Sequence, residues 1–388
     1  MKLTINQKLL EKSLAHANWV IEKRQAVPIM GYVLFEAEEG IGIRISASNM
    51  DMTIVESLKS EVSESGAYCL SAGLLYDITR KLPAEAEIHI QFDKENNSVL
   101  LRSKSATFTL YYMERDSFPP RGNDEYLVSF TMNEKILKNA IDVAKVAMLQ
   151  DNTRFHLNGI HIHYENELGN NKLRFVATDL FRISCVSIDS SAETQKMPPI
   201  IISKRAAAEL LKLIDDSSEK SVHVSVSENR ICFKITAEDE TITEFSSRLI
   251  NGSFPEYRGA LEVSNDKILI VDNKALINAL DRVSTVVTST SSSVKLNIQQ
   301  NKITLTGMSR ELGTAVEELE VSFNAFDSFE ICFNSRYLLE ILKQIETPQV
   351  KMLFAESTSS TLIQPTDARE KPYLDMIFAI MPIEIVND

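Results

Sequence analysis

Two histidines placed two residues apart are the most suggestive reactive groups in this sequence. His161 and His163 alternate with isoleucine in Ile160-His161-Ile162-His163, so both would lie on one face of a strand and could ligate a metal together. No third ligand motif stands nearby, and a metal site needs more than two protein ligands. We therefore expect two side chains on a solvated strand face.

The other groups with chemical potential are equally isolated. Asp215-Asp216 follows an expected helix, where solvated charge is commoner than a catalytic carboxylate pair. No GxxxxGK[ST], GxGxxG after a strand, GxSxG or HExxH motif is present. Four single cysteines without a CxxC are typical of buried free thiols in a cytosolic protein: Cys69, Cys185, Cys232 and Cys332. We predict a non-catalytic protein without a cofactor or metal.

The elements that would position these residues occur three times along the chain. One helix-start phrase occurs at 3–10, 130–137 and 270–277, and a second at 70–75, 202–205 and 333–339. In each, Asn or Ser precedes the expected helix, where its side chain can accept a hydrogen bond from the first turn. The six expected N-caps are Asn6, Ser71, Asn133, Ser203, Asn273 and Asn334. They predict helices over 6–18, 71–82, 132–147, 203–214, 273–286 and 334–345.

Between the helices the pattern changes to period two, for example at 41–47, 221–226 and 302–306, which indicates strands. Each repeat thus reads as helix, antiparallel strands, helix and strands, an α+β domain with its helices on one sheet face. The Ser-Phe-Pro phrases at 117–119 and 253–255 mark the ends of repeats, because Pro ends ladder pairing. We predict three domains, 1–127, 128–256 and 257–388.

The charge is distributed unevenly between helices and the rest of the chain. The net charge is −13, yet the six expected helices carry 14 Lys and Arg against 7 Asp and Glu. Solvated helix surfaces would explain this pattern, and so would helices that face a polyanion from an otherwise acidic body. No apolar run approaches the ~20 residues that span a bilayer, and residues 1–7 lack the apolar core of a signal peptide. We expect a cytoplasmic protein without a membrane partner.

Four phrases give the chain a resemblance to a known family. They are Thr-Arg-Phe-His-Leu-Asn-Gly at 153–159, Val-Ala-Thr-Asp-Leu-Phe-Arg at 176–182, Gly-Ser-Phe-Pro-Glu-Tyr-Arg at 252–258, and Met381-Pro382. In that order, over essentially the whole chain, they resemble the bacterial sliding clamps, the beta subunits of DNA polymerase III. The resemblance implies a head-to-tail homodimer that closes a ring of six domains, with helices lining the hole. A DNA-independent scaffold of repeated domains and an enzyme with an unrecognised site are the alternatives.

The resemblance also implies the function and partners. Such a ring would encircle duplex DNA without sequence preference and act as a processivity factor for the replicative polymerase. Peptides from the polymerase III catalytic subunit, the clamp loader, other polymerases and repair proteins would bind one shared groove. The groove residues that it implies, together with the C-terminal run, are Leu157, Thr178, Arg182, Ile183, Pro255, Ala260, Asn334, Tyr337, Thr358, Ser360, Ala379, Met381, Pro382 and Ile383.

Two further sets of residues would serve DNA and ring closure. The resemblance places Arg24, Gln150 and the Phe155-His156 pair on loops near the opening, and the helix cations add Arg80, Lys204 and Arg205. Phe108 and Leu110, on an alternating strand, are apolar candidates for one side of the subunit interface, and Val286 for the other.

This sequence departs from the family pattern at two places around the groove. Leu180-Phe181 stands where the family usually has Gly-His, and 381–385 reads Met-Pro-Ile-Glu-Ile where it usually has Met-Pro-x-Arg-Leu. We expect the bulkier pair to reshape the groove. Glu384 replaces a positive charge at its rim, so peptides with acidic flanks should be disfavoured.

Overall fold

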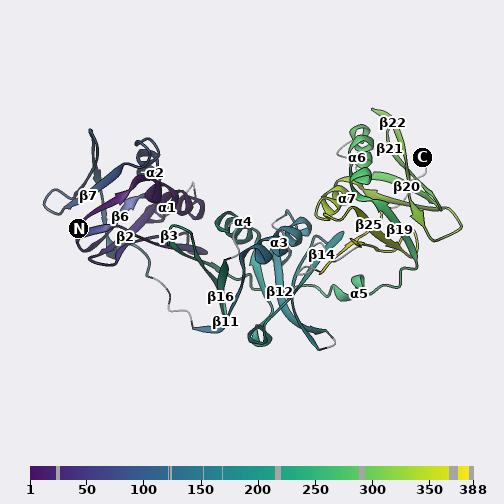
Figure 1. Ribbon diagram of the computed structural model, residues 1–388, viewed down its shortest axis with the longest axis horizontal. Helices are drawn as coiled ribbons and strands as arrows, with labels where there is room; N and C mark the ends of the chain where they lie inside the picture. Colours follow the sequence, from purple (N-terminus) through teal and green to yellow (C-terminus); the bar gives the residue numbers. More distant parts are fainter. Residues whose placement is uncertain are drawn as a thin grey trace. The chain divides into compact units, whose positions relative to one another are not determined.

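The computed structural model describes residues 1–22, 27–120, 122, 125–151, 153–167, 169–214, 220–287, 293–366 and 375–383 (Figure 1). Arg24, Asp215, Asp216 and Glu384 lie outside the described residues. The contacts within the chain divide it into two units, which consist of 1–135 with 205–249 and of 136–204 with 250–388.

All six predicted helices are present. They are α1 (Gln7–Val20), α2 (Ala72–Thr79), α3 (Glu134–Ala144), α4 (Lys204–Leu213), α6 (Asn273–Val283) and α7 (Ser335–Leu342). Short 3-10 turns extend α3 to Ala147 and α6 to Val286, and the single turn α5 (Arg258–Leu261) was not predicted.

Two of the predicted caps are confirmed by side-chain hydrogen bonds, Ser71 takes the cap position of α2 without such a bond, and one prediction is wrong. Asn6 accepts from the Lys8 N–H at 2.9 Å, and Asn334 accepts from the first turn of α7. Asn273 is not a cap, because Asp272 takes that position and accepts from the Ala275 N–H at 2.7 Å. Asn273 is instead buried. Its side-chain amide donates to the carbonyl of Leu342, the last residue of α7, and to that of Ile345, which follows the helix.

The first unit contains two antiparallel sheets. The smaller has the order β5 (Glu61–Glu64), β1 (Lys2–Asn6), β7 (Glu87–Asp93), β8 (Ser98–Ser103), β9 (Ala106–Tyr111). The larger has the order β10 (Met113–Glu114), β6 (Gly66–Ser71), β2 (Tyr32–Glu38), β3 (Gly42–Ser48), β4 (Met52–Leu58), β18 (Ile242–Arg248), β17 (Arg230–Thr236), β16 (Ser221–Ser227), β11 (Tyr126–Asn133). Helix α1 buries Leu10, Leu14 and Ala17, one apolar stripe at helical spacing.

The second unit repeats this plan. Its larger sheet has the order β15 (Ile200–Ser203), β12 (Gly159–Glu167), β13 (Asn170–Thr178), β14 (Arg182–Asp189), β27 (Asp375–Ile380), β26 (Thr361–Pro365), β25 (Gln349–Phe354), β19 (Lys267–Asp272), β23 (Ser322–Phe323). The smaller has the order β22 (Gly313–Glu320), β21 (Lys302–Ser309), β20 (Ser293–Gln299), β24 (Phe329–Asn334).

Each larger sheet contains one seam at which strands of two neighbouring sequence repeats pair. Strand β4 pairs with β18 in the first unit, and β14 pairs with β27 in the second. Both ladders are antiparallel and join neighbouring sequence repeats through continuous hydrogen bonding. The second repeat thus contributes strands to both larger sheets, which is why the contacts within the chain group into the two units given above.

Candidate functional site

The turn between β13 and β14 is held by the side chain of Asp179. Its Oδ1 accepts from the backbone N–H groups of Phe181 and Arg182, each at 3.0 Å. Thr178 completes the turn, since its hydroxyl accepts from the Leu180 N–H at 3.0 Å and donates to the Arg182 carbonyl at 2.8 Å. Leu180 has a φ of 74°, a left-handed conformation that costs an L-residue about 1–2 kcal/mol.

Arg182 fixes this turn to α7. Its guanidinium is buried, donates to Asp179 Oδ2 at 3.0 Å and to Glu340 Oε2 at 2.7 Å, and stacks 4.2 Å from the ring centroid of Tyr337. Burial is the largest single influence on the pKa of the Glu340 carboxyl and acts to raise it. Arg336 and Arg182 together outweigh burial and hold this pKa below its usual range. The turn is therefore rigidly placed.

The chain leaves the sheet next to Pro382, as predicted from the missing N–H of proline. Strand β27 ends at Ile380, and the Met381 N–H then donates to the Phe181 carbonyl at 2.8 Å. Beyond Pro382, the Ile383 N–H donates to the Cys332 carbonyl at 2.8 Å. These bonds leave the Met381 side chain exposed beside the turn.

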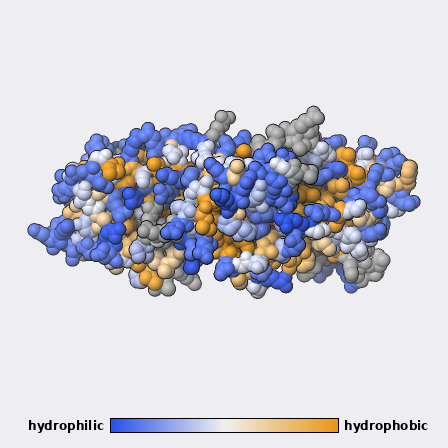
Figure 2. Space-filling view, turned by 90° about the horizontal axis from the view of Figure 1, so that it is seen from below, coloured by the Kyte–Doolittle hydropathy of each residue, from blue (hydrophilic) through white to orange (hydrophobic). Residues whose placement is uncertain are grey.

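A cavity of about 180 Å³ lies between this turn and the end of β27. Leu180, Phe181 and Met381 border it and are 48%, 61% and 43% exposed. The structure brings together at this cavity the predicted residues Thr178, Arg182, Ile183, Pro255, Ala260, Ser360, Ala379 and Met381. Hydrophilic residues cover most of the face shown in Figure 2, and hydrophobic residues interrupt it in patches.

Six predicted groove residues do not line this cavity. Leu157 is buried, Asn334 caps α7, and Tyr337 lies against Arg182. The others are Thr358, Pro382 and Ile383. Sequence reasoning also missed Glu256 and Tyr257, which line it, although they directly follow the predicted Pro255.

The histidine pair is a packing element, and the expectation of a solvated face was wrong for His163. His161 stacks between His163 and Phe254, with both ring centroids 4.7 Å away. His163 is buried and its Nε2 lies 3.1 Å from the Tyr257 hydroxyl. Burial lowers the pKa of His163 to about 3 and raises that of Tyr257 to about 12. This cluster holds the segment at 254–257, which forms one wall of the cavity.

The loop residues predicted to meet DNA form a local group with Lys204. The Lys204 ammonium donates to Gln150 Oε1, and the Leu149 N–H donates to the Leu157 carbonyl at 3.1 Å. Phe155 is exposed, and its ring meets that of His156 edge-on with centroids 5.7 Å apart. Lys204, Gln150 and this ring pair thus share one region of the second unit.

Many helix cations are neutralised by nearby carboxylates. Arg80 is 2.9 Å from Asp77, and Arg205 is 2.6 Å from Glu22. Similar ion pairs join Lys145 with Asp142, Lys212 with Glu209, Arg282 with Glu317 and Arg336 with Glu340. Four of these six carboxylates are among the 7 acidic helix residues counted from the sequence, so only Glu22 and Glu317 lower the excess of positive charge further.

Comparison with known proteins identifies the family. Models of the N-terminal, central and C-terminal domains of the DNA polymerase III beta subunit match residues 1–121, 131–256 and 260–379. The chain belongs to the DNA polymerase III beta subunit family. Its function is that of a DNA sliding clamp, a non-catalytic processivity factor, rather than that of an enzyme or a DNA-independent scaffold.

Individual clamps cover the whole chain. The beta sliding clamp of Caulobacter vibrioides is 33% identical over 386 residues, 99% of this chain and 100% of that protein. The solved beta sliding clamp of C. crescentus has a TM-score of 0.91 at 32% identity and covers 99% of both chains. That of Bartonella birtlesii, solved with bound griselimycin, has a TM-score of 0.91 at 30% identity and covers 99% of this chain and 100% of its own.

The residues predicted for clamp closure lie on a strand at one sheet edge and beside a strand at another. β9 is an edge strand on which Phe108 and Leu110 are half-buried and the intervening threonine is exposed. In the second unit β22 is an edge strand, and Val286 is half-buried in the 3-10 turn that contacts it. These edges present unpaired backbone groups that another strand can satisfy.

The described residues contain no group of three or more His, Cys, Asp and Glu side chains arranged to hold a metal ion. Cys69, Cys185 and Cys332 are buried free thiols, and Cys232 is half-buried. Burial raises the pKa of Cys69 to about 11 and that of Cys185 to about 12, so both stay protonated. No described helix is long and apolar enough to cross a membrane.

Proposed function

We propose that this clamp works in the cytoplasm as a head-to-tail homodimer of three-domain subunits, divided at 1–127, 128–256 and 257–388. The ring encircles duplex DNA and tethers polymerase III through peptides that bind the cavity beside the β13–β14 turn. The observation that carries this proposal is the convergence of Thr178, Ile183, Ala379 and Met381 on that one cavity. The same site would serve the clamp loader, other polymerases and repair proteins in turn.

The chemistry of the cavity suits a short flexible peptide. Leu180, Phe181 and Met381 offer exposed apolar surface, and thioether side chains adapt to varied ligands. The turn below them is rigid because Asp179 and Arg182 are hydrogen-bonded on several sides. Apolar anchors on a preformed frame keep the entropic cost of binding low, which allows many partners to share the site.

Deletion of Met381–Asp388 tests the peptide site. We expect this variant to lose binding of a labelled Gln-x-x-Leu-Phe pentapeptide in fluorescence anisotropy, while the dimer and its retention on DNA persist. The control is Phe326→Ala, since Phe326 is a strongly exposed apolar residue that does not line the cavity. Unchanged peptide affinity after the deletion would place the site elsewhere.

Ring closure requires the two exposed edges to meet. Strand β9, with Phe108 and Leu110, would pair with the C-terminal domain of the second subunit near Val286 and β22. Such heterologous, head-to-tail pairing of two different edges closes the dimer into a ring, which removes all four edges from solvent and thereby prevents aggregation. A closed ring should stay on circular DNA at moderate salt and be released when the circle is linearised. Equal release from both forms would contradict encirclement.

DNA contacts would be loose and independent of sequence. We assign them to Gln150, Phe155, His156 and Lys204 in the second unit and to Arg80 and Arg205 in the first, together with Arg24. Because Arg80 and Arg205 already have carboxylate partners, each phosphate contact must compete with an internal ion pair. Weak contacts of this kind suit a ring that slides, since the closed ring rather than the affinity retains the DNA.

A further inference from the structure

One wall of the peptide cavity has no regular secondary structure. Pro255, Glu256 and Tyr257 line the cavity, and residues 251–257 belong to neither a helix nor a strand. Within the part of the chain that the structure describes, no backbone–backbone hydrogen bond reaches residues 251–256. The position of this wall therefore depends on the contacts of its side chains.

Two aromatic side chains hold this wall against strand β12. The Phe254 ring lies nearly parallel to that of His161, with ring centroids 4.7 Å apart and an angle of 11° between the planes. Tyr257 is buried, and its hydroxyl lies 3.1 Å from Nε2 of His163. Because His161 and His163 both belong to β12, the wall is attached to one strand of the sheet at two points.

The hydrogen bonding of Tyr257 fixes the tautomer of His163. The guanidinium of Arg174 also bonds the Tyr257 hydroxyl and can only donate, so the hydroxyl oxygen accepts from it. The O–H of Tyr257 then donates to Nε2 of His163, which stays unprotonated because burial lowers the pKa of this ring to about 3. The neutral ring carries its proton on Nδ1, which is buried and has no hydrogen-bond partner among the described residues.

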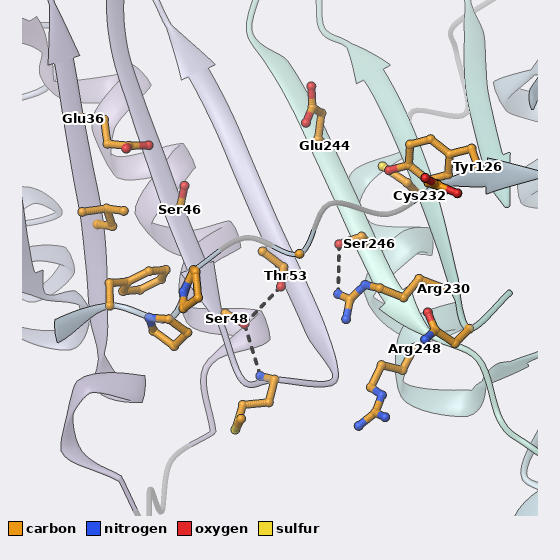
Figure 3. Close-up of a pocket in the computed structure, with 18 of the residues that line it drawn as sticks. Glu36, Ser46, Ser48, Thr53, Tyr126, Arg230, Cys232, Glu244, Ser246 and Arg248 are labelled. Carbon is orange, nitrogen blue, oxygen red and sulfur yellow. Dashed lines mark hydrogen bonds between the residues drawn. The ribbon is translucent and has the colours of Figure 1, made fainter. Parts of the chain in front are cut away.

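The first unit shows that this fold does not require a buried histidine at this position. Glu36 is opposite Arg44 in the β2–β3 ladder, as His163 is opposite Arg174 in the β12–β13 ladder. Both ladders lead into a turn with a left-handed residue. Glu36 is half-buried on β2 (Figure 3) and lies 3.8 Å from Arg44. A surface ion pair thus takes the place that the buried histidine has in the second unit.

The buried histidine is not explained by stability. An unpartnered buried N–H destabilises a folded protein, whereas replacing both partners of the pair by apolar groups of the same shape can be neutral. The second unit therefore retains the pair for another reason. The wall that the pair holds lines the peptide cavity, which supplies that reason.

We propose that His163 and Tyr257 are positioning residues of the peptide site. Their hydrogen bond fixes the irregular wall at 254–257, so that the cavity has its binding shape before a peptide arrives and less conformational entropy is lost on binding. His163 does not line the cavity and acts through Tyr257. The inference rests on the proposed peptide site and adds to it a residue that sets affinity without touching the peptide.

The test measures binding of a labelled Gln-x-x-Leu-Phe pentapeptide to the full-length clamp at neutral pH by fluorescence anisotropy. We expect His163→Leu and Tyr257→Phe each to weaken binding about three- to tenfold, because either one removes the same hydrogen bond. The double variant should bind no more weakly than the weaker single variant. Tyr164→Phe is the matched control and should change affinity less than about twofold, since it removes a hydroxyl from the same strand whose 2.6 Å bond to Asn171 lies outside the cavity.

Two further measurements distinguish positioning from general support of the fold. The double variant replaces both polar partners by apolar side chains, so its midpoint of urea unfolding should equal or exceed that of the original clamp. His163→Gln restores a polar atom near the position of Nε2 and should bind the peptide within about twofold of the original clamp. A double variant with weaker binding and a lower urea midpoint would overturn the proposal, since His163 would then only support the fold.

Deletion of Met381–Asp388 separates failure of this inference from failure of the peptide site. If the deletion leaves binding intact, the peptide site is elsewhere and the inference falls with it. If the deletion abolishes binding while His163→Leu and Tyr257→Phe bind like the original clamp, the peptide site stands and the positioning role is wrong.

Discussion

Replacing Leu180 with glycine separates the two roles that this residue has in the peptide site. Its backbone is left-handed, with a φ of 74°, and its side chain is 48% exposed beside the cavity. Glycine adopts this conformation without strain but provides no apolar anchor. The substitution should therefore have opposite effects on backbone strain and on peptide affinity.

The stability of Leu180→Gly is best compared with that of Leu180→Ala, because alanine also removes most of the leucine side chain. Relief of the left-handed strain gains about 1–2 kcal/mol, and the greater freedom of unfolded glycine costs about 0.5–1 kcal/mol. Leu180→Gly should thus be more stable than Leu180→Ala by about 0.5–1 kcal/mol, whereas in an ordinary strand the order is reversed. Urea unfolding followed by circular dichroism measures this difference.

The effect on binding follows from the exposed half of the leucine. Full burial of a leucine is worth about 1.5–3 kcal/mol, so covering the exposed half with a peptide contributes about 0.8–1.5 kcal/mol. Leu180→Gly should weaken a Gln-x-x-Leu-Phe peptide about 4- to 12-fold. Met50→Gly is the matched control, because Met50 has the same backbone conformation at the other seam.

The control should leave the affinity for this peptide unchanged. Two results would refute the reasoning. If Leu180→Ala is as stable as Leu180→Gly, the backbone at this position is not strained. If Leu180→Gly and Met50→Gly lose the same peptide affinity, Leu180 is not the anchor.

Three further predictions concern the interface, pH and DNA. Phe108→Asp should yield a folded monomer in light scattering, and a persistent dimer or an unfolded chain would favour ordinary core packing. Burial lowers the pKa of His163 to about 3, so the unfolded state takes up protons first as pH falls below about 6.5. The contribution of His163 to the free energy of unfolding should be fully present above that pH and fall towards pH 3 by up to about 1.4 kcal/mol per pH unit. In urea unfolding at a series of pH values, His163→Gln should show a smaller decline than the original protein. Lys204→Gln should reduce the salt dependence of DNA binding by about one phosphate contact, equally for unrelated duplexes, and a sequence-selective loss would contradict this.

The helices and the family were accessible from the sequence because they depend on local patterns. Asn6 and Asn334 precede apolar stripes at helical spacing, and their caps form as those patterns predict. The phrases at 176–182 and 252–258 are contiguous, so they identify the sliding clamps without knowledge of the fold. The prediction that Pro382 ends the last strand also needed only the missing N–H of proline.

The partners of those elements were decided by the tertiary structure. Nothing local distinguishes Asp272 from Asn273 as a cap, and Asn273 is buried because its amide meets carbonyls near α7 some seventy residues away. The sequence pattern predicts a solvated side chain at His163, but in the fold the rings of His161 and Tyr257 pack against it. The alternation of apolar and polar residues indicates which face of a strand is buried. It does not indicate the neighbouring strand, because any strand of matching register can form the backbone hydrogen bonds. The pairings of β4 with β18 and of β14 with β27 therefore exist only in the fold, and the second of them creates the peptide cavity.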